Sequence, residues 1–355
     1  MANIRQKKHR FIINSKILTR EQRINAFVKL GQFLQADEWK NSPILDSAVH
    51  KNAWYTKPNV LQQIHAIAHN LTHEKLEKWL KDVPNQDTDK SVGLVLAGNL
   101  PLVGFHDIMC VLLAGFTAKI KVSSDDAGLT KFILDQLIEI EPQFAEKIQL
   151  VEKLENFDLV IATGSNNSAR YFEYYFGKKP NIIRKNRNSL SVLSGDETKE
   201  ELVALGHDIF DYFGLGCRSV SKIFIPEGYD IAKLLDNLES FHPIKDHSKY
   251  NNNYDFNKSI YLINKNKHFD NGFLLLKEDE SLASPLAVVH FEYYKSMEEV
   301  EKYIIAHKDE IQCITSDMGL KVGDVPVFPF GASQYPALDD YADNVNTLDF
   351  LLANQ

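Results

Sequence analysis

The chain has 355 residues and a formal net charge of −8; 44% of the residues are hydrophobic and 25% are charged. This balance is typical of a globular protein, and the length suits two lobes better than a single core. The acidic net charge argues against nucleic acid as a partner, because nucleic-acid-binding domains usually present a basic face.

The first elements along the chain are predicted helices. Residues 1–14 are basic but lack the long apolar run of a signal peptide, and no window approaches the roughly 20 apolar residues of a membrane span. We therefore expect a cytoplasmic protein without membrane insertion. Apolar positions at helical spacing predict helices over 20–36 and 59–80, and Thr72 is expected to cap a second helix inside the longer stretch.

From residue 92, short β-rich runs alternate with helical patterns. The predicted strands cover residues 93–98, 118–122, 148–151, 158–164 and 181–185. Predicted helices pass through Ile108 and Leu112 and cover 126–140 and 165–176. Strand and helix in alternation predict a parallel sheet with right-handed crossovers, which is a doubly wound nucleotide-binding architecture. We assign residues 1–195 to this lobe, with its amino-terminal helices.

A similar pattern continues in the second half of the chain. Helices are expected at 199–213, 230–240 and 296–306, and strands at 222–226, 259–264, 272–277, 286–292 and 312–316. The polar residues 242–258 predict a surface loop. The fold class is therefore α/β, with two lobes that each contain a mainly parallel sheet flanked by helices. We assign residues 196–320 to the second lobe and expect residues 321–355 to return and cover the cleft.

Cys217 is the strongest candidate for chemistry from the residues alone. It stands in FGLGCRSVS, where Gly214 and Gly216 let the backbone approach a ligand, and where the neighbouring Arg218 is expected to lower the pKa of the thiol. A thiolate attacks carbonyl carbon well. The alternative is a buried structural cysteine, which is what the apolar surroundings of Cys110 and Cys313 predict for those two residues. The cysteines form no CxxC pair, which fits a reducing compartment and excludes a cysteine-rich metal site.

Three polar positions follow predicted strands. Asn99, in AGNLPLVG, either donates a hydrogen bond to a developing oxyanion or caps a helix that opens at Leu102. The segment TGSNNSA (163–169) can hold a pyrophosphate with backbone N–H groups, but alone it indicates a turn and a cap. Lys121, at the end of another strand, either contacts a phosphate or is solvated.

Histidines offer weaker signals. His65, His69 and His73 recur every four residues, but no glutamate of an HExxH motif accompanies them. A solvated helix face is therefore expected and no metal site. His207 lies ten residues before Cys217 in the sequence, and the surface of a helix is its expected place.

A charge pattern precedes the second lobe. No Asp or Glu occurs between Phe176 and Asp196. The same window contains the cations Lys178, Lys179, Arg184, Lys185 and Arg187.

Taken together and in order, four motifs carry a family resemblance. AGNLPLV, AGFTAKIKVSS, DLVIATGS and GLGCRS resemble the aldehyde dehydrogenase superfamily. The chain is most similar to the acyl-CoA reductase branch, to which the bacterial bioluminescence fatty-acid reductases belong. This similarity runs from residue 90 to the carboxyl end.

The resemblance implies roles for individual residues. The superfamily's nucleophilic cysteine matches Cys217, and its oxyanion-binding asparagine matches Asn99. Its ribose-binding lysine matches Lys121, which is followed by Ser123 and Ser124 in the expected cofactor site. The turn that covers the cofactor phosphates matches Thr163, Gly164 and Ser165.

The resemblance also implies a reaction. Hydrolytic relatives activate water with a glutamate, whose usual place falls in the carboxylate-free window 176–196. The expected function is therefore NADPH-dependent reduction of an acyl-CoA to an aldehyde through an S-acyl intermediate on Cys217. NADPH is favoured over NADH because Ser124 stands where NAD-selective relatives carry a carboxylate. Acyl-CoA is the expected partner, and the sequence leaves open whether the protein forms an oligomer.

Two alternatives stay open at this point. A phosphate-activated semialdehyde dehydrogenase would consume an acyl phosphate instead of acyl-CoA. A non-catalytic descendant of the fold would bind nucleotide or acyl groups as a scaffold. Two departures from the superfamily pattern favour the latter: Ala169 replaces a glycine of the phosphate turn, and Ser281 replaces a ribose-binding glutamate.

Overall fold

The computed structural model describes residues 18–36 and 38–355. The basic segment 1–14, for which no signal peptide is predicted, lies outside the described residues. Within the described part of the chain, no helix combines the length and the apolar character needed to cross a membrane.

The first lobe is built on a parallel sheet in the order β3-β2-β1-β4-β5. Its strands are β1 (Ser91–Val95), β2 (Thr117–Lys121), β3 (Ile148–Leu150), β4 (Leu159–Thr163) and β5 (Asn181–Arg184). The crossover helices are α5 (Phe105–Leu113), α6 (Leu129–Ile140) and α7 (Asn166–Phe176). From β1 the chain moves to one side of the sheet, and at β4 it returns to the other side. A crevice therefore opens at the carboxyl ends of β1 and β4, where open parallel sheets bind ligands.

Four amino-terminal helices form an outer layer that packs on α5 and α6: α1 (Arg20–Gln35), α2 (Pro43–Lys51), α3 (Lys57–Asn70) and α4 (His73–Trp79). Side-chain caps set their starts. Thr19 and Gln22 form a capping box at α1, and Thr72 accepts a hydrogen bond from the Lys75 N–H at α4, as the sequence predicts. Buried residues of α1, such as Phe27 and Leu30, join the same core as those of β1 and α5.

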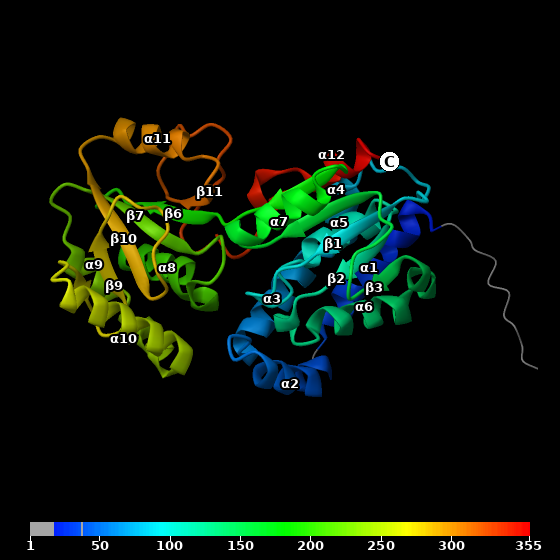
Figure 1. Cartoon of the computed structure of the whole chain (residues 1–355). Coiled ribbons are helices and arrows are strands. Elements are labelled where there is room, and N and C mark those ends of the chain that lie inside the picture. Colours follow the sequence, from blue (N-terminus) through cyan, green and yellow to red (C-terminus); the bar gives the residue numbers. More distant parts are fainter. Residues whose placement is uncertain (1–17, 37) are drawn as a thin grey trace, which may run out of the picture.

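The second lobe is built on a sheet in the order β12-β11-β6-β7-β10-β9-β8. Its strands are β6 (Asn188–Val192), β7 (Val220–Pro226), β8 (Phe269–Asp270), β9 (Leu275–Glu278), β10 (Val288–Tyr294), β11 (Ile311–Thr315) and β12 (Val327–Phe328). Every pairing is parallel except that of β8 with β9. The lobe's α-helices are α8 (Lys199–Phe210), α9 (Ile231–Asn237), α10 (Ser248–Ile263) and α11 (Met297–Ala306). The predicted α/β class with two mainly parallel sheets is confirmed (Figure 1).

Several elements differ from the sequence prediction, most clearly in two regions. Residues 242–258, predicted as a loop, and the strand predicted at 259–264 form a short 3-10 helix, η5 (Glu239–Asp246), and the long helix α10. Strand β6 was not predicted, and it already belongs to the second sheet. The chain therefore passes from one sheet to the other between β5 and β6, before the boundary expected near Gly195.

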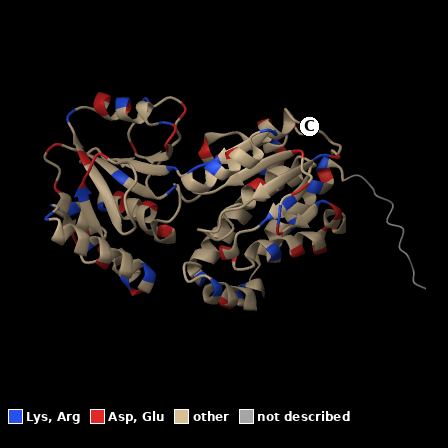
Figure 2. Ribbon diagram, viewed as in Figure 1, with Lys and Arg blue, Asp and Glu red and all other residues tan. Residues whose placement is uncertain are grey.

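The chain crosses between the lobes a second time near its carboxyl end. After β12 it runs back along the cleft, and the last helix, α12 (Thr347–Leu352), packs against α5 of the first lobe (Figure 1). Leu338, Tyr341 and Leu348 join the first lobe's core on this return. Acidic and basic side chains are distributed over both lobes (Figure 2).

Candidate active site

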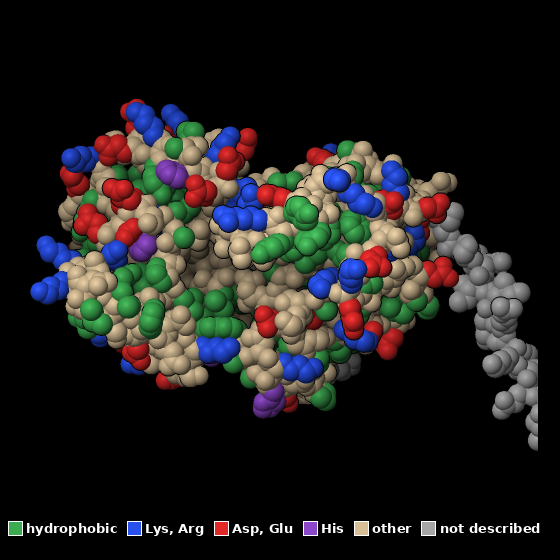
Figure 3. All heavy atoms as spheres, viewed as in Figure 1, with side chains coloured by type: hydrophobic (Ala, Val, Ile, Leu, Met, Phe, Trp, Pro, Cys, Tyr) green, Lys and Arg blue, Asp and Glu red, His purple; other side chains and the backbone are tan. Residues whose placement is uncertain are grey.

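A large cleft lies between the lobes, at the carboxyl ends of β1 and β4. It has a volume of about 1210 Å³, and Figure 3 shows the hollow from one side. The first lobe contributes the turns after β1 (97–100) and β4 (163–166). The second lobe contributes the loop 214–218, and the returning segment contributes several positions between Gln334 and Asp343. The cleft is large enough for a dinucleotide together with a second substrate.

Cys217 lies in a loop between the 3-10 helix η4 (Asp211–Gly214) and β7, and it lines the cleft. Tyr212, Phe213 and Gly214 before it have φ values of 54°, 62° and 76°, so three successive residues are left-handed. Bulky residues rarely adopt this conformation, and such backbone is typical of functional sites that the surrounding structure holds in place. Ser189 of β6 donates a hydrogen bond to the Cys217 carbonyl over 2.9 Å. The loop is therefore fixed from the sheet below it.

The electrostatics of the thiol differ from the sequence expectation. Burial of the sulfur raises the pKa of the Cys217 thiol, and Arg218 and then Arg184 oppose that rise while Asp343 adds to it. The expected net lowering by Arg218 is therefore wrong, because burial outweighs the cation. The residue as a whole is half-buried, whereas Cys110 and Cys313 are fully buried, as predicted.

Asn99 is exposed in the cleft, after β1. Its Nδ2 donates to the Leu215 carbonyl over 3.0 Å and keeps a second hydrogen, while the Cys217 N–H finds no acceptor on another described residue. The capping alternative is wrong, since α5 begins after Gly104 and no side chain caps it. The two residues expected to supply oxyanion donors therefore line the same cleft.

The expected cofactor residues fall into two groups. Thr163, Gly164 and Ser165 line the cleft, and the Ser165 Oγ accepts from the Ser168 N–H at the start of α7. The second group, Lys121, Ser123 and Ser124 at and after the end of β2, does not line the cleft. Lys121 is exposed and donates to the Glu152 carbonyl over 2.8 Å. Ser123 and Ser124 open the short 3-10 helix η2 (Ser124–Asp126).

The residues present fit a nicotinamide dinucleotide. The cleft covers the switch point between β1 and β4, and the start of the 11-residue helix α7 borders it, which is the usual arrangement for a pyrophosphate. Ser281, expected near the nicotinamide ribose, is exposed outside the cleft, and its N–H donates to Asp279. Ala283 and Ser284 line the cleft in its place.

The fold brings carboxylates to the cations of the window 176–196. Arg184 forms a buried ion pair with Asp107 of α5, Lys185 pairs with Glu173 over 2.9 Å, and Arg187 pairs with Asp343 over 3.5 Å. Residues 177–195 contain no carboxylate, but the fold brings Asp107, Glu173 and Asp343 from other parts of the chain into the cleft wall. Sequence reasoning missed Asp107 and Asp343, because both are distant in sequence from the residues they contact.

The histidines lie away from the thiol. His65 and His69 belong to α3 and His73 opens α4, where it lies 3.2 Å from Glu21. His207 pairs with Asp211 over 3.0 Å and does not line the cleft. Among the described residues, no group of His, Cys, Asp and Glu side chains is arranged to hold a metal ion.

Part of the cleft is apolar. Ala66 and Ile67 of α3, Leu100, Val103, Met109 of α5 and Leu338 of the returning segment line it together. Such a surface suits an aliphatic group.

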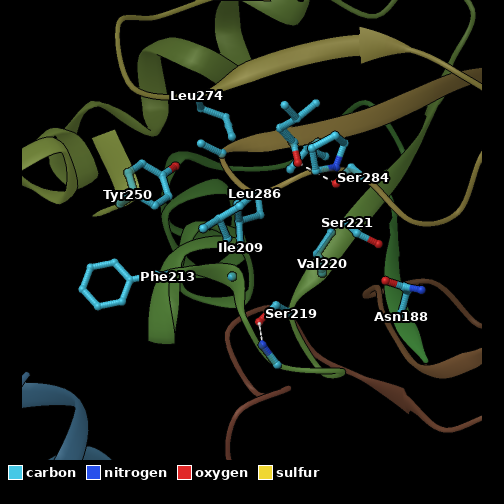
Figure 4. Close-up of a pocket in the computed structure, with 16 residues that line it drawn as sticks. Asn188, Ile209, Phe213, Ser219, Val220, Ser221, Tyr250, Leu274, Ser284 and Leu286 are labelled. Carbon is cyan, nitrogen blue, oxygen red and sulfur yellow. Dashed lines mark hydrogen bonds between the residues drawn. The ribbon is translucent and has the colours of Figure 1, made fainter. Parts of the chain in front are cut away.

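A second, smaller pocket of about 80 Å³ lies inside the second lobe, on the other side of the Cys217 loop (Figure 4). Phe213, Ile209, Tyr250 and Leu286 face it. The backbone turn of the loop is tied there by a hydrogen bond from the Gly216 N–H to the Ser219 Oγ. Gly214 and Gly216 line both cavities, so the loop is the thin wall between them.

Solved structures with the same fold are aldehyde dehydrogenases. An aldehyde dehydrogenase of Bacillus cereus, solved with NAD⁺, matches with a TM-score of 0.62 and 13% identity over 88% of this chain and 77% of that chain. The aldehyde dehydrogenase KauB of Pseudomonas aeruginosa matches with a TM-score of 0.62 and 12% identity, over 88% of this chain and 77% of that chain. An NADP-dependent glyceraldehyde-3-phosphate dehydrogenase of Bacillus halodurans C-125, complexed with NADP, matches with a TM-score of 0.61 and 14% identity. This match covers 87% of this chain and 78% of that chain.

Two lobes with mainly parallel sheets around a cleft define a protein of the aldehyde dehydrogenase fold. A family model described as acyl-CoA reductase (LuxC) matches residues 43–238, which is more than half of the chain. The chain belongs to this acyl-CoA reductase family. The match begins well before residue 90, so the similarity includes α2 to α4, and it ends at residue 238, short of the carboxyl end that the resemblance was expected to reach. No curated protein sequence matches the chain.

Proposed function

We propose that the protein reduces an acyl-CoA to an aldehyde with NADPH, through a covalent S-acyl intermediate on Cys217. The observation that carries this proposal is that the half-buried Cys217 and Asn99, whose backbone N–H and side-chain amide are the two candidate donors, line one cleft. Family membership supports the substrate class, and the apolar part of the cleft supports an aliphatic acyl group.

The chain's own residues carry out the first half of the reaction. The Cys217 sulfur attacks the thioester carbonyl carbon, and the oxygen of that carbonyl gains negative charge as the bond forms. The second Nδ2 hydrogen of Asn99 and the Cys217 N–H stabilise this charge. The bond to the CoA sulfur then breaks, and the acyl group stays on Cys217. When bound, the nicotinamide cofactor supplies the hydride that reduces this thioester.

NADPH is proposed on the residues after β2. Ser124 carries no charge that repels a 2′-phosphate, and the exposed Lys121 ammonium lies at the end of β2, three residues earlier. Turnover measured in parallel with NADPH and NADH distinguishes the two cofactors.

The test is mass spectrometry of the intact protein after mixing with acyl-CoAs of several chain lengths, in the absence of nicotinamide. We expect one acyl adduct on the wild-type protein, on the peptide that contains Cys217. Cys217→Ala should abolish the adduct, since the nucleophile is gone, whereas Cys110→Ala should retain it, because Cys110 is buried in the core. An adduct that persists in Cys217→Ala, or a wild-type protein that no acyl-CoA modifies, contradicts the proposal.

The same experiment separates the two other functions. An acyl phosphate that acylates Cys217 where acyl-CoA does not favours a phosphate-activated dehydrogenase. A scaffold protein would leave Cys217 no more reactive toward iodoacetamide than the buried Cys110.

A further inference from the structure

Tyr55, in the short connection between α2 and α3, holds the turn that carries Asn99. Its side chain is fully buried, and its hydroxyl lies 2.9 Å from the Gly98 carbonyl oxygen and 2.9 Å from the Leu100 carbonyl oxygen. These two carbonyls flank Asn99 in the sequence. Burial raises the pKa of the Tyr55 hydroxyl, so it keeps its proton and acts as the donor. The turn after β1 is therefore fixed from the amino-terminal helices.

The neighbouring Trp54 reaches the second lobe. Its side chain packs against the cores of both lobes. The Trp54 ring stacks on the ring of His247 with 4.9 Å between the centroids, and its centroid lies 5.3 Å from that of Phe213. Phe213 is one of the left-handed residues that lead into the Cys217 loop. Trp54 therefore contacts the backbone turn of the nucleophile through a side chain of that turn.

The first half of α3 adds two hydrogen bonds to the same stretch. The Tyr212 hydroxyl donates to the Gln63 Oε1 over 3.0 Å, and the Gln62 Nε2 donates to the Asp211 Oδ2 over 2.6 Å. Tyr212 is 2% exposed, so its hydroxyl is removed from water and needs the acceptor that Gln63 provides. Left-handed backbone at a bulky residue persists where the surrounding structure holds it, and at Tyr212 that hold comes from α3.

The proposed acyl transfer depends on the alignment of these two turns. The Cys217 sulfur attacks the carbonyl carbon while the Asn99 amide must face the oxygen of the same carbonyl. The two residues belong to different lobes. A reacting group that is misplaced by about 1 Å can lose about 10²-fold in rate. Contacts that fix both turns from one segment therefore bear on the rate of acylation.

We propose that Tyr55 and Tyr212 are positioning residues of the acyl transfer. Tyr55 sets the Asn99 turn, and Tyr212, held by Gln63, sets the Cys217 loop. The segment 54–63 of the first lobe thereby aligns donor and nucleophile, although neither tyrosine hydroxyl takes part in bond making. This assignment rests on the proposed acyl-CoA reductase function.

Three variants of the full-length protein test the assignment, and each removes one hydroxyl while it keeps the ring. Tyr55→Phe and Tyr212→Phe lose the hydroxyls that act on the two turns. Tyr294→Phe is the matched control. Its hydroxyl donates to the Leu193 carbonyl over 2.7 Å within the second lobe, and Tyr294 does not line the cleft.

Each variant is compared in two reactions of Cys217. Single-turnover acylation at saturating acyl-CoA, followed by mass spectrometry, needs alignment with Asn99, whereas alkylation by iodoacetamide needs only an accessible thiolate. Tyr55→Phe and Tyr212→Phe should acylate about tenfold or more slowly than the wild type, and their alkylation rates should stay within about twofold. The pH midpoint of alkylation should not move. Tyr294→Phe should alter neither reaction.

A double variant tests the contact between the two lobes. Gln63→Leu removes the acceptor of the Tyr212 hydroxyl, so it should slow acylation as Tyr212→Phe does. The double variant of Gln63→Leu and Tyr212→Phe should be no slower than Gln63→Leu alone, because both changes remove the same hydrogen bond.

The outcomes separate the two proposals. If Tyr55→Phe and Tyr212→Phe acylate as fast as Tyr294→Phe, the two hydroxyls only support the fold, and the assignment is overturned. A parallel loss of acylation and alkylation shows that the thiol has become less accessible or less ionised, which overturns it as well. Additive losses in the double variant overturn the role of Gln63. A wild-type protein that iodoacetamide alkylates but no acyl-CoA acylates rejects the proposed function itself.

Discussion

Asn99 has two amide hydrogens and two tasks. One hydrogen ties the turn after β1 to the Leu215 carbonyl, two residues before the nucleophile, and the other is free in the cleft. The same side chain therefore links the turn after β1 to the Cys217 loop of the other lobe, and in the proposed reaction it offers a donor to the substrate. A donor placed in advance of the reaction needs no reorganisation as charge develops.

Asn99→Ala should lower kcat by about 10²–10³-fold, the loss typical of removing one oxyanion donor. The measurement is steady-state turnover of an acyl-CoA with NADPH. Asn99→Asp is the matched variant of nearly equal shape, and it should be impaired as well because a carboxylate cannot donate. A loss of less than tenfold in Asn99→Ala would remove Asn99 from the oxyanion site.

At this scale the sequence predicts residues that occupy motifs. Cys217 and Asn99 are found because each stands in a turn between predicted elements with a recognisable neighbourhood. Asp343 has no such signal, since it is one of several Asp and Asn residues in a segment of turn chemistry. Its contacts with Gln312 and Arg187 depend on two separate crossings of the chain between the lobes. The sequence predicted that Arg218 lowers the pKa of the Cys217 thiol, whereas burial raises it. Burial depends on residues that are distant in sequence, so the neighbouring Arg218 could not indicate it.

The turns after β1 and β2 are packed against each other at the base of the cleft. A Cβ added to Gly98 would lie 2.6 Å from the Ser123 Oγ and 2.7 Å from the Ser123 Cβ. Glycine is therefore required for close approach of the segment that carries Asn99 to the segment that carries Ser123.

Gly98→Ala should shift the Asn99 turn and lower kcat, and it should also destabilise the protein by about 1–3 kcal/mol through overpacking. Gly319→Ala is the matched control, because its added Cβ meets no atom within 4 Å and its backbone is not left-handed. Turnover and thermal unfolding of both variants provide the measurements. Equal behaviour of the two variants would show that the contact with Ser123 relaxes freely.

Elements with a clear hydrophobic period are predicted from the sequence, and those with polar interiors are not. The buried side of α10 consists of Tyr250, Tyr254, Asn257 and Tyr261. These residues recur at helical spacing, but their side chains carry polar groups, so the segment lacks the apolar pattern by which a helix is predicted. Strand β6 buries Ser189 and Ser191, whose hydroxyls donate to the Cys217 and Thr315 carbonyls. Hydrogen bonds to distant residues make these interiors stable, and a local pattern does not contain that information.

Asp208 of α8 joins the returning segment to the second lobe. It is fully buried and accepts hydrogen bonds from the Gly331 N–H and from the N–H and hydroxyl of Ser333. Burial nevertheless dominates and raises the pKa of Asp208 from 3.8 to about 6. The segment that closes the cleft therefore depends on a carboxyl group that titrates in a mildly acidic range.

The sign of the pH effect follows from linkage. Between about pH 4 and pH 6 the folded state binds more protons at Asp208 than the unfolded state does, so this group's contribution to stability decreases as pH rises through that window. Asp208→Asn cannot ionise, and it should be destabilised at pH 4 because an amide N–H replaces an acceptor. Its deficit relative to the wild type should shrink by about 2 kcal/mol between pH 4 and pH 7. Chemical denaturation at both pH values measures this, and a deficit independent of pH contradicts it.

The lobes are joined by two connections, one between β5 and β6 and the other along the returning segment. The pair of Arg187 and Asp343 brings these connections together beside the cleft. Because the two links lie side by side, rotation of the lobes about the line through them strains the backbone less than twisting one lobe against the other. Opening must also break the hydrogen bonds that join Gln62 and Gln63 to Asp211 and Tyr212. Substrate entry by simple opening would then carry Asn99 and Cys217 apart and back along one fixed arc, and each closure would restore the same alignment of donor and sulfur.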